Sequence, residues 1–93
     1  MFQSRRVLFD LGRVVATPGV LAAIDYSSIR VALGRHVSGD WGDCDDHDRK
    51  ANTAAVRNGS RILSAYHDAN GTKFWIITEW DRSVTNVELH ICH

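Results

Sequence analysis

The sequence contains few of the features that mark a specialised chain. It has one Pro and two Cys among 93 residues, and no apolar run is long enough to cross a membrane. Its eleven basic and eleven acidic side chains give a formal net charge of zero. These absences exclude a disulfide framework and a collagen-like or low-complexity chain, and they disfavour both a strongly basic nucleic-acid binder and a strongly acidic DNA mimic.

What is present is typical of one small globular domain that covers residues 1–93. The chain is 44% hydrophobic and 24% charged, and three Trp, three Phe and two Tyr can fill a thin core. Cys44 and Cys92 do not form a CxxC pair, so we expect reduced thiols and a cytoplasmic protein without a signal peptide. No motif indicates a cofactor or a metal, and we expect neither.

Three short helices are predicted before the last third of the chain. Thr17 is suited to cap a helix over about residues 18–25, because a Pro follows it at the first helical position. Either Ser27 or Ser28 is expected to cap a second helix with an apolar stripe. A third helix follows an Asp-rich loop and ends at about Asn58, where a Gly provides the stop signal.

The last third of the sequence predicts a three-stranded antiparallel meander. The predicted strands cover about residues 61–67, 72–80 and 84–91. Asn70-Gly71 is a strong hairpin signal, and a two-residue turn there sets the strand register. The core face would then carry Ile62, Tyr66, Trp75, Ile77, Val87, Leu89 and Ile91. The predicted fold class is α+β, with three short helices packed on one face of the meander and residues 6–9 as a candidate fourth strand.

The same register places Phe74, Ile76 and Trp80 on the opposite face, where they would form a sizeable exposed apolar patch. Such a patch is typical of a surface that binds another protein or a second copy of the chain, unless the N-terminal arm covers it. The turn that follows adds Asp81 and Arg82 to this candidate surface. Ordinary turn chemistry is one alternative interpretation of this segment. Acid–base catalysis by a carboxylate pair, Glu79 and Asp81, beside Arg82 is another.

Charge is distributed unevenly, because residues 38–48 carry five Asp and no Lys or Arg. The candidate partner-binding residues in this segment are Trp41, Asp43, Asp45, Asp46 and Asp48. These carboxylates could cap the next helix, recognise a protein or hold a hard cation. The calcium-loop spacing fails, because Asp48 stands at the sixth position from Asp43 and Ala54 at the twelfth.

The histidines do not indicate a catalytic site. His36 lies in the apolar stripe of the second helix and is expected to be a hydrogen-bonded structural residue. His67 and His90 share one face of the meander, but they are two strands apart, or about 9.5 Å, which is too far for easy shared ligation. No His accompanies a nucleophile at a recognised spacing, so no catalytic residue is predicted.

Several strings resemble one family of small bacterial proteins. They are Val15–Gly19 (VATPG), Arg35–Asp43 (RHVSGDWGD), Arg61–Tyr66 (RILSAY) and Trp75–Glu79 (WIITE), followed by Asp-Arg-Ser at 81–83. The family occurs on plasmids, prophages and other mobile elements, and its members are called plasmid-related or hypothetical proteins. Some carry the label of a type I restriction–modification subunit, but 93 residues hold no methyltransferase fold. This chain departs from the pattern at Trp80 and at its His-Ile-Cys-His end.

The sequence therefore predicts a non-enzymatic protein that binds another protein stoichiometrically. The resemblance implies a mobile-element inhibitor of host defence, directed at a CRISPR effector or a restriction enzyme. One alternative is a small metal-dependent nuclease or hydrolase that uses the Asp-rich loop and His47. Another is a nucleic-acid-binding accessory protein, for which salt-sensitive binding would be the mark. Its candidate contacts are Arg5, Arg6, Arg13, Arg30 and Arg35, with Phe9.

Overall fold

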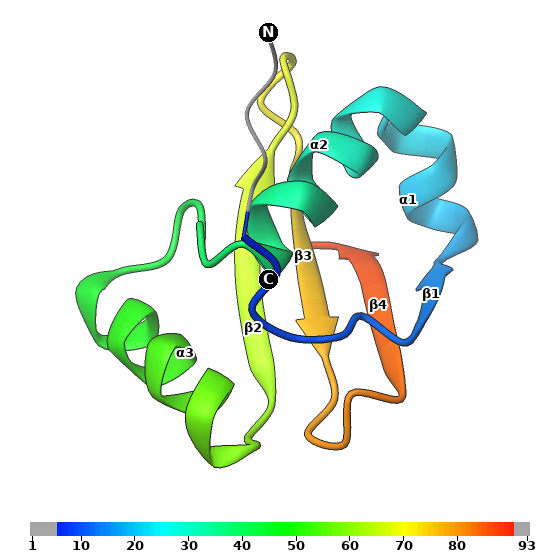
Figure 1. Cartoon of the computed structure of the whole chain (residues 1–93). Coiled ribbons are helices and arrows are strands. Elements are labelled where there is room, and N and C mark those ends of the chain that lie inside the picture. Colours follow the sequence, from blue (N-terminus) through cyan, green and yellow to red (C-terminus); the bar gives the residue numbers. More distant parts are fainter. Residues whose placement is uncertain (1–5, 91–93) are drawn as a thin grey trace, which may run out of the picture.

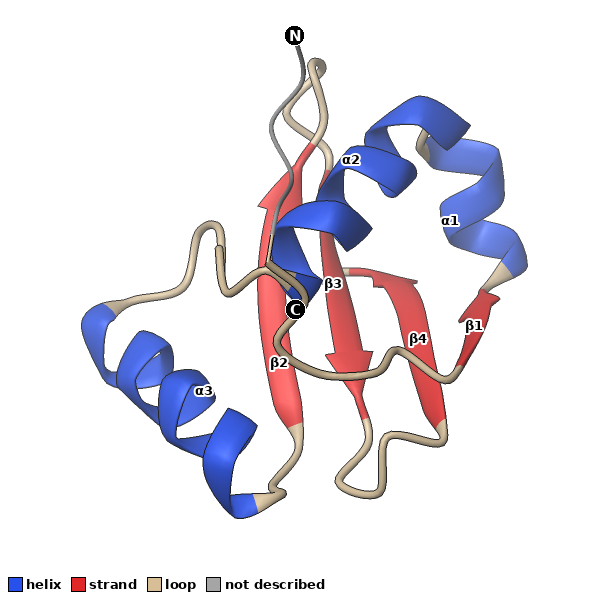
Figure 2. Ribbon diagram, in the orientation of Figure 1, coloured by secondary structure: helices blue, strands red, loops and turns tan. Residues whose placement is uncertain are grey.

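The computed structural model describes residues 6–90, which form a four-stranded sheet and three helices (Figures 1 and 2). In chain order the elements are β1 (Arg13–Ala16), α1 (Pro18–Ala23), α2 (Tyr26–Val37), α3 (Asp46–Asn58), β2 (Ile62–His67), β3 (Lys73–Thr78) and β4 (Val84–Leu89). The strand order is β1-β4-β3-β2, and β1 runs parallel to β4 while the other pairs are antiparallel. The predicted α+β class is confirmed, but the sheet has four strands and is mixed.

The helix ends follow local chemistry. Thr17 caps α1 as predicted, because its Oγ1 accepts a hydrogen bond from the Val20 N–H at 3.2 Å. The cap of α2 is Asp25 and not Ser27 or Ser28; its carboxylate accepts hydrogen bonds from both serine hydroxyls and from one backbone N–H. These bonds lower the pKa of Asp25. A carboxylate accepts more bonds than a hydroxyl, and it suits the positive end of the helix.

The predicted hairpin exists, but its register differs by one residue. Asp68 and Thr72 close a three-residue loop, with the Asp68 N–H donating to the Thr72 carbonyl at 3.0 Å. Asp68 Oδ1 also accepts from the N–H groups of Asn70 and Thr72, and Gly71 takes the left-handed conformation with φ 83°. A one-residue slip moves every side chain of a strand to the other face of the sheet.

This slip reverses the two faces of β3. Phe74 and Ile76 are 1% and 0% exposed and lie in the core, so the prediction that they form an exposed binding patch is wrong. Trp75 and Ile77, predicted to be core residues, lie on the opposite face of the sheet. The placements of Ile62, Tyr66, Val87 and Leu89 on the core face are confirmed, while Ile91 lies outside the described residues.

The core lies between one face of the sheet and the covering segments. Helices α1 and α2 cross this face, and α3 lies beside the edge of β2 (Figure 1). A larger cluster joins α1 and α2 to Tyr66, Phe74, Ile76 and Val87. A smaller cluster gathers Phe9, Trp41, Cys44, Ala55 and Ile62. The candidate strand over residues 6–9 is not formed: this N-terminal arm packs through Phe9 on the helix-bearing side, and the chain becomes a strand only at β1.

Candidate functional site

Trp41 anchors the Asp-rich loop in the core. Its side chain is 5% exposed, and its ring lies 6.3 Å from the ring of Phe9 and 6.0 Å from that of His36, measured between centroids. Its Nε1 donates a hydrogen bond to Thr53 Oγ1 on α3 at 3.3 Å. The sequence places Trp41 on the partner surface, whereas the structure buries it, because so large an apolar ring is better accommodated in the small cluster.

The backbone after Trp41 is paired with the outer edge of β2. The Asp43 N–H donates to the Ala65 carbonyl at 2.7 Å, and the Ala65 N–H donates to the Trp41 carbonyl at 3.4 Å. Gly42 lies between them with φ 70°, and a Cβ at this position would stand 2.1 Å from the Ala65 carbonyl oxygen. Only Gly combines this conformation with so close an approach. The loop is therefore fixed where it leaves the core.

Arg49 of α3 fixes the next part of the loop. Its guanidinium donates to the Cys44 carbonyl at 2.9 Å and to the Gly42 carbonyl at 3.0 Å. The Cys44 thiol points inward, lies 3.6 Å from the Leu63 carbonyl and has a pKa raised by burial. Sequence analysis missed this role of Arg49, because an Arg beside an acidic run suggests ion pairing more readily than bonds to loop carbonyls.

This framework displays the predicted carboxylates toward solvent. Asp45 caps α3 by accepting from the Asp48 N–H at 2.8 Å, and Asp46 stands in the first turn. All three are exposed, and carboxylates at a helix N-terminus are stabilised by the helix dipole. Asp43 is also exposed and accepts a hydrogen bond from His67 Nδ1 at 2.7 Å. The acidic loop, defined as residues 40–48, is thus a fixed acidic surface.

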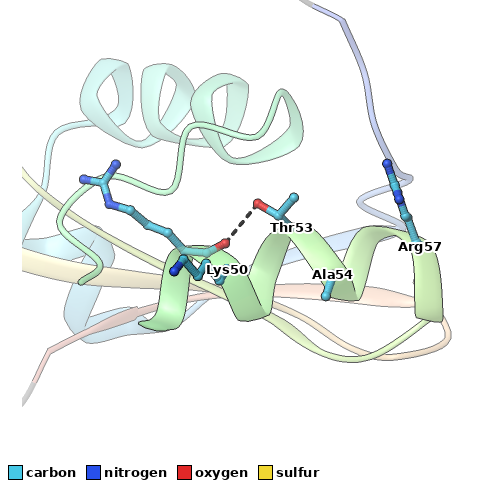
Figure 3. A pocket seen from close by; sticks show the side chains of 5 residues that line it. Lys50, Thr53, Ala54 and Arg57 are labelled. Atoms are coloured by element: carbon cyan, nitrogen blue, oxygen red, sulfur yellow. Dashed lines mark hydrogen bonds between the residues drawn. The ribbon is translucent and has the colours of Figure 1, made fainter. Parts of the chain in front are cut away.

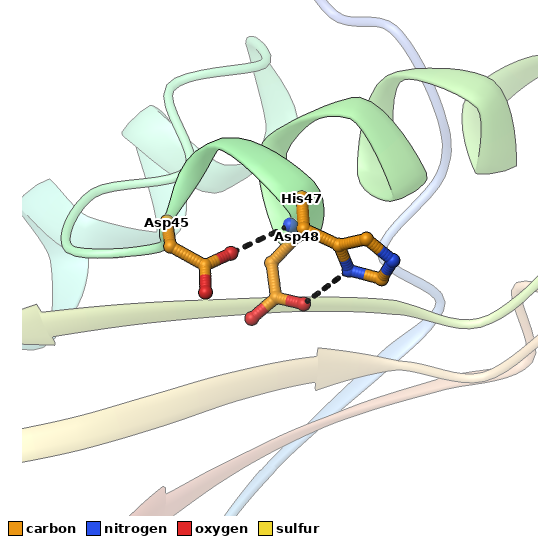
Figure 4. Close-up of side chains that lie close together, drawn as sticks. All are labelled: Asp45, His47 and Asp48. Carbon is orange, nitrogen blue, oxygen red and sulfur yellow. Dashed lines mark hydrogen bonds and ion pairs between the residues drawn. The ribbon is translucent and has the colours of Figure 1, made fainter.

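Three of these side chains could approach a metal ion. Ligand atoms of Asp45, His47 and Asp48 lie within 4.8 Å of one another, with His47 Nδ1 3.5 Å from an Asp48 oxygen (Figure 4). All three residues are exposed, and one Asp45 oxygen is already used as the helix cap. His47 is therefore paired with Asp48. The cluster offers two carboxylates and one imidazole without a surrounding shell that would hold them in place.

The hydrogen-bond network around His36 contains residue types that also occur in catalytic sites, but its side chains are fully buried. Its Nδ1 shares a hydrogen bond with Ser64 Oγ, and its Nε2 lies 2.9 Å from Thr78 Oγ1, which bonds to Thr85 Oγ1 at 2.7 Å. Each of the four side chains is 0% exposed. Burial, with a contribution from Arg82, lowers the pKa of His36 to about 4. The expectation of a hydrogen-bonded structural His is confirmed.

In the turn after β3, the side chain of Trp80 is exposed, and those of Asp81 and Arg82 make hydrogen bonds within the fold. Trp80 is 67% exposed, as the sequence predicts. Asp81 accepts hydrogen bonds from the backbone and hydroxyl of Ser83, which lower its pKa. Arg82 adopts φ 60° and donates to the Ala55 carbonyl of α3 at 2.8 Å. Arg82 therefore ties this turn to α3, and of the three residues Trp80 offers the largest free surface.

A shallow groove of about 600 Å³ runs along the outer side of α3 (Figure 3). It is lined by Arg49, Lys50, Thr53, Ala54 and Arg57. The lining belongs to a single helix, and Arg49 is already bonded to the loop carbonyls. Arg49 and Lys50 directly follow Asp48, so the basic lining of the groove adjoins the acidic loop.

The arginines proposed for nucleic-acid binding have separate surroundings. Arg5 lies outside the described residues, and Arg13 and Arg30 are exposed. Arg35 donates two hydrogen bonds to Asp40, at 2.8 and 3.1 Å, and this carboxylate raises the Arg35 pKa. Phe9 is 8% exposed and is not available for stacking on a base.

Comparisons with known proteins add no identity to this geometry: no family model matches, and neither a curated protein nor a solved structure matches the chain. Within residues 6–90, no helix has both the length and the apolar character needed to span a membrane.

Proposed function

We propose that this chain acts by stoichiometric binding of another protein, and that the acidic loop makes the main contact. The observation that carries the proposal is the rigidity of an acidic surface whose backbone is held by β2, by Arg49 and by the buried Trp41. A surface that is ordered before binding loses less conformational entropy when the complex forms. Four exposed carboxylates are then offered in one arrangement.

The chemistry of the loop favours a basic partner. Asp43, Asp45, Asp46 and Asp48 face solvent; His67 pairs with Asp43 and His47 with Asp48, and the Arg35 guanidinium also interacts with Asp43 through its charge. Complementary charge accelerates association and disfavours other partners. Proteins that bind nucleic acid carry Lys and Arg on the surface that contacts phosphates, so an acidic loop can compete for that surface.

The resemblance to mobile-element proteins supports a particular class of target. A defence nuclease, whether a CRISPR effector or a restriction enzyme, has a basic nucleic-acid channel that meets this requirement. The chain would then be a small inhibitor that occupies part of the channel. Because its net charge is zero, the contact would be local and would not depend on imitation of DNA by the whole surface.

A metal-dependent activity is the second candidate, and the grouping of Asp45, His47 and Asp48 favours it. Thermal unfolding with Mg²⁺, Mn²⁺, Ca²⁺ or Zn²⁺ separates the two proposals. The binding proposal expects no rise in the midpoint with any of these ions. A rise that disappears in His47→Ala would support the metal site.

Capture of partners tests the proposal directly. The tagged protein is incubated with lysate of its natural host, and bound proteins are quantified by mass spectrometry. We expect one stoichiometric protein, and we expect its yield to fall at least about tenfold with Asp45→Asn/Asp46→Asn. Asn preserves the helix cap at position 45, so the variant removes charge and keeps the loop.

A matched variant removes two carboxylates elsewhere. Asp10→Asn/Asp25→Asn also neutralises one exposed side chain and one helix cap. It should capture the partner as the wild type does. Equal loss with both variants would show that total charge, and not the acidic loop, determines binding.

A further inference from the structure

The face of the sheet opposite the helices is not covered by any element formed by residues 6–90 (Figures 1 and 2). Its apolar part consists of Leu63 and Ala65 on β2 and Trp75 and Ile77 on β3, and Asn86 and Glu88 of β4 lie beside Ile77 and Trp75. Leu63 and Trp75 are half-buried, and they shield Ala65 and Ile77, which are each 7% exposed. We call this surface the open face.

Charged and polar residues form the two ends of the open face. Lys73 on β3 is flanked at one end by His67 and His90, and the His90 ring stacks on Trp75 with 4.9 Å between centroids. At the other end, Glu79 lies 3.7 Å from Arg61. An apolar patch bordered by polar residues, as the β2 and β3 side chains form here, is common in protein interfaces.

The two edges of the sheet leave few backbone groups free to pair with a partner strand. The outer edge of β2 is closed, because the Asn52 side chain bonds both the N–H and the carbonyl of Leu63 and the acidic loop bonds Ala65. β1 has only four residues, which limits the number of hydrogen bonds that an added strand could form. The open face is therefore more accessible to a partner than either edge of the sheet.

We propose that the open face binds the open face of a second copy of this chain, with the two β3 strands antiparallel. This inference goes beyond the proposed function and does not depend on it. A two-fold axis between Trp75 and Ile77 places each Trp75 on the Ile77 of the other copy. The same axis places each Lys73 against a Glu79, so the charges complement one another twice.

The charge pattern also selects this orientation. If the two β3 strands were parallel, Lys73 would face Lys73 and Glu79 would face Glu79, which is destabilising. In the antiparallel arrangement Arg61 meets the opposite His67, which is already bonded to the Asp43 carboxylate. Sheets that pack in this way stand about 10 Å apart, with their strands within about 30° of each other.

The area of the open face indicates a weak, reversible dimer. Four strands at about 4.8 Å and six residues at about 3.3 Å give roughly 400 Å² of projected area on each copy. Together the two copies would bury about 1,000 Å² once surface relief is included, which is at the low end for specific interfaces. A reversible dimer with a dissociation constant of about 10–100 µM is therefore expected.

Sedimentation velocity over a concentration series tests the inference. The wild type should pass from monomer to dimer between about 1 and 500 µM. Lys73→Glu should weaken the dimer about tenfold, and Lys73→Glu/Glu79→Lys should restore most of the affinity, because the pair is reversed and not removed. Trp75→Ala should weaken it about a hundredfold.

Matched controls keep each outcome decisive. Trp80→Ala removes an exposed Trp outside the open face, and Asp45→Asn/Asp46→Asn changes only the acidic loop, so both should dimerise as the wild type does. Lys73 is exposed, so its substitution tests the interface even if Trp75→Ala fails to fold. A wild type that stays monomeric at all concentrations, or a charge-reversed double variant no tighter than Lys73→Glu, would overturn the proposal. A monomer whose Trp75 fluorescence responds to an oligonucleotide would overturn it in favour of nucleic acid.

Discussion

His36 is at the centre of a hydrogen-bond network that joins three strands and a loop. It bonds Ser64 and Thr78, and Thr78 bonds Thr85, whose hydroxyl donates to the Leu11 carbonyl at 2.7 Å. Every member of this network is satisfied, so the cost of burying polar groups is offset. In the described residues no buried side-chain nitrogen or oxygen lacks a hydrogen-bond partner.

Acid should destabilise the fold through His36. The folded state holds the pKa near 4, whereas the unfolded chain protonates this residue near the ordinary value of 6.5. The stability is thus fully present above pH 6.5 and is lost as the pH falls through the folded pKa, to a total of about 3 kcal/mol. Urea unfolding between pH 7 and 4 measures the loss, and NMR of the imidazole gives the titration itself. A His36 signal that titrates at its ordinary value would contradict this account.

Residue types alone could not reveal which polar side chains support the fold. Trp41 and Arg82 suggested contact residues in the sequence, yet one is the anchor of a loop and the other bonds a carbonyl of α3. Their partners, Thr53 and Ala55, lie 12 and 27 residues away along the chain. Such pairings depend on the folded topology, so no local pattern predicts them.

At the scale of elements, the position of the acidic loop depends on Gly42. Gly42 and Gly71 in the hairpin both adopt the left-handed backbone conformation, but their surroundings differ. A Cβ at Gly42 would collide with the Ala65 carbonyl, whereas nothing lies within 4 Å of a Cβ at Gly71. A comparison of substitutions at the two glycines therefore distinguishes the cost of backbone strain from the cost of a steric clash.

Substitution of these glycines should give unequal effects. Gly71→Ala should cost about 1 kcal/mol, the price of a left-handed conformation for an L-residue. Gly42→Ala carries the same strain and must also move the loop away from β2, so we expect a loss of about 3 kcal/mol. Chemical unfolding followed by circular dichroism measures both. Equal losses would show that the loop is not held against β2 as described.

The elements themselves could be predicted, but the register could not. Capping residues and Gly stops identify helices because they act within one turn, and two of the three predicted caps and stops agree. The hairpin prediction took Asn70-Gly71 as a two-residue turn, while the Asp68 side chain stabilises a loop one residue longer. β3 reads Lys73–Thr78 (KFWIIT), which is apolar on both faces, so the pattern offered no correction.

At the scale of the whole molecule, the two faces of the sheet differ in what covers them. One side carries both core clusters under the helices and the arm, and it provides the stability of the chain. The other side, the open face, and the acidic loop at the edge of β2 are the surfaces that we propose for partners. The two surfaces adjoin where Asp43 of the acidic loop accepts a hydrogen bond from His67 of the open face, and a dimer through the open face would present two acidic loops to a partner with two basic sites.

The most direct test of the account is the affinity of the captured partner for the loop variants, measured by calorimetry with purified proteins. We predict one binding site for each chain and an affinity that falls as salt rises from about 0.05 to 0.5 M, because the contact is electrostatic. Asp45→Asn/Asp46→Asn should weaken binding at least about tenfold, and Asp10→Asn/Asp25→Asn should leave it unchanged. Wild-type affinity in the loop variant would contradict the claim that the acidic loop is the binding surface.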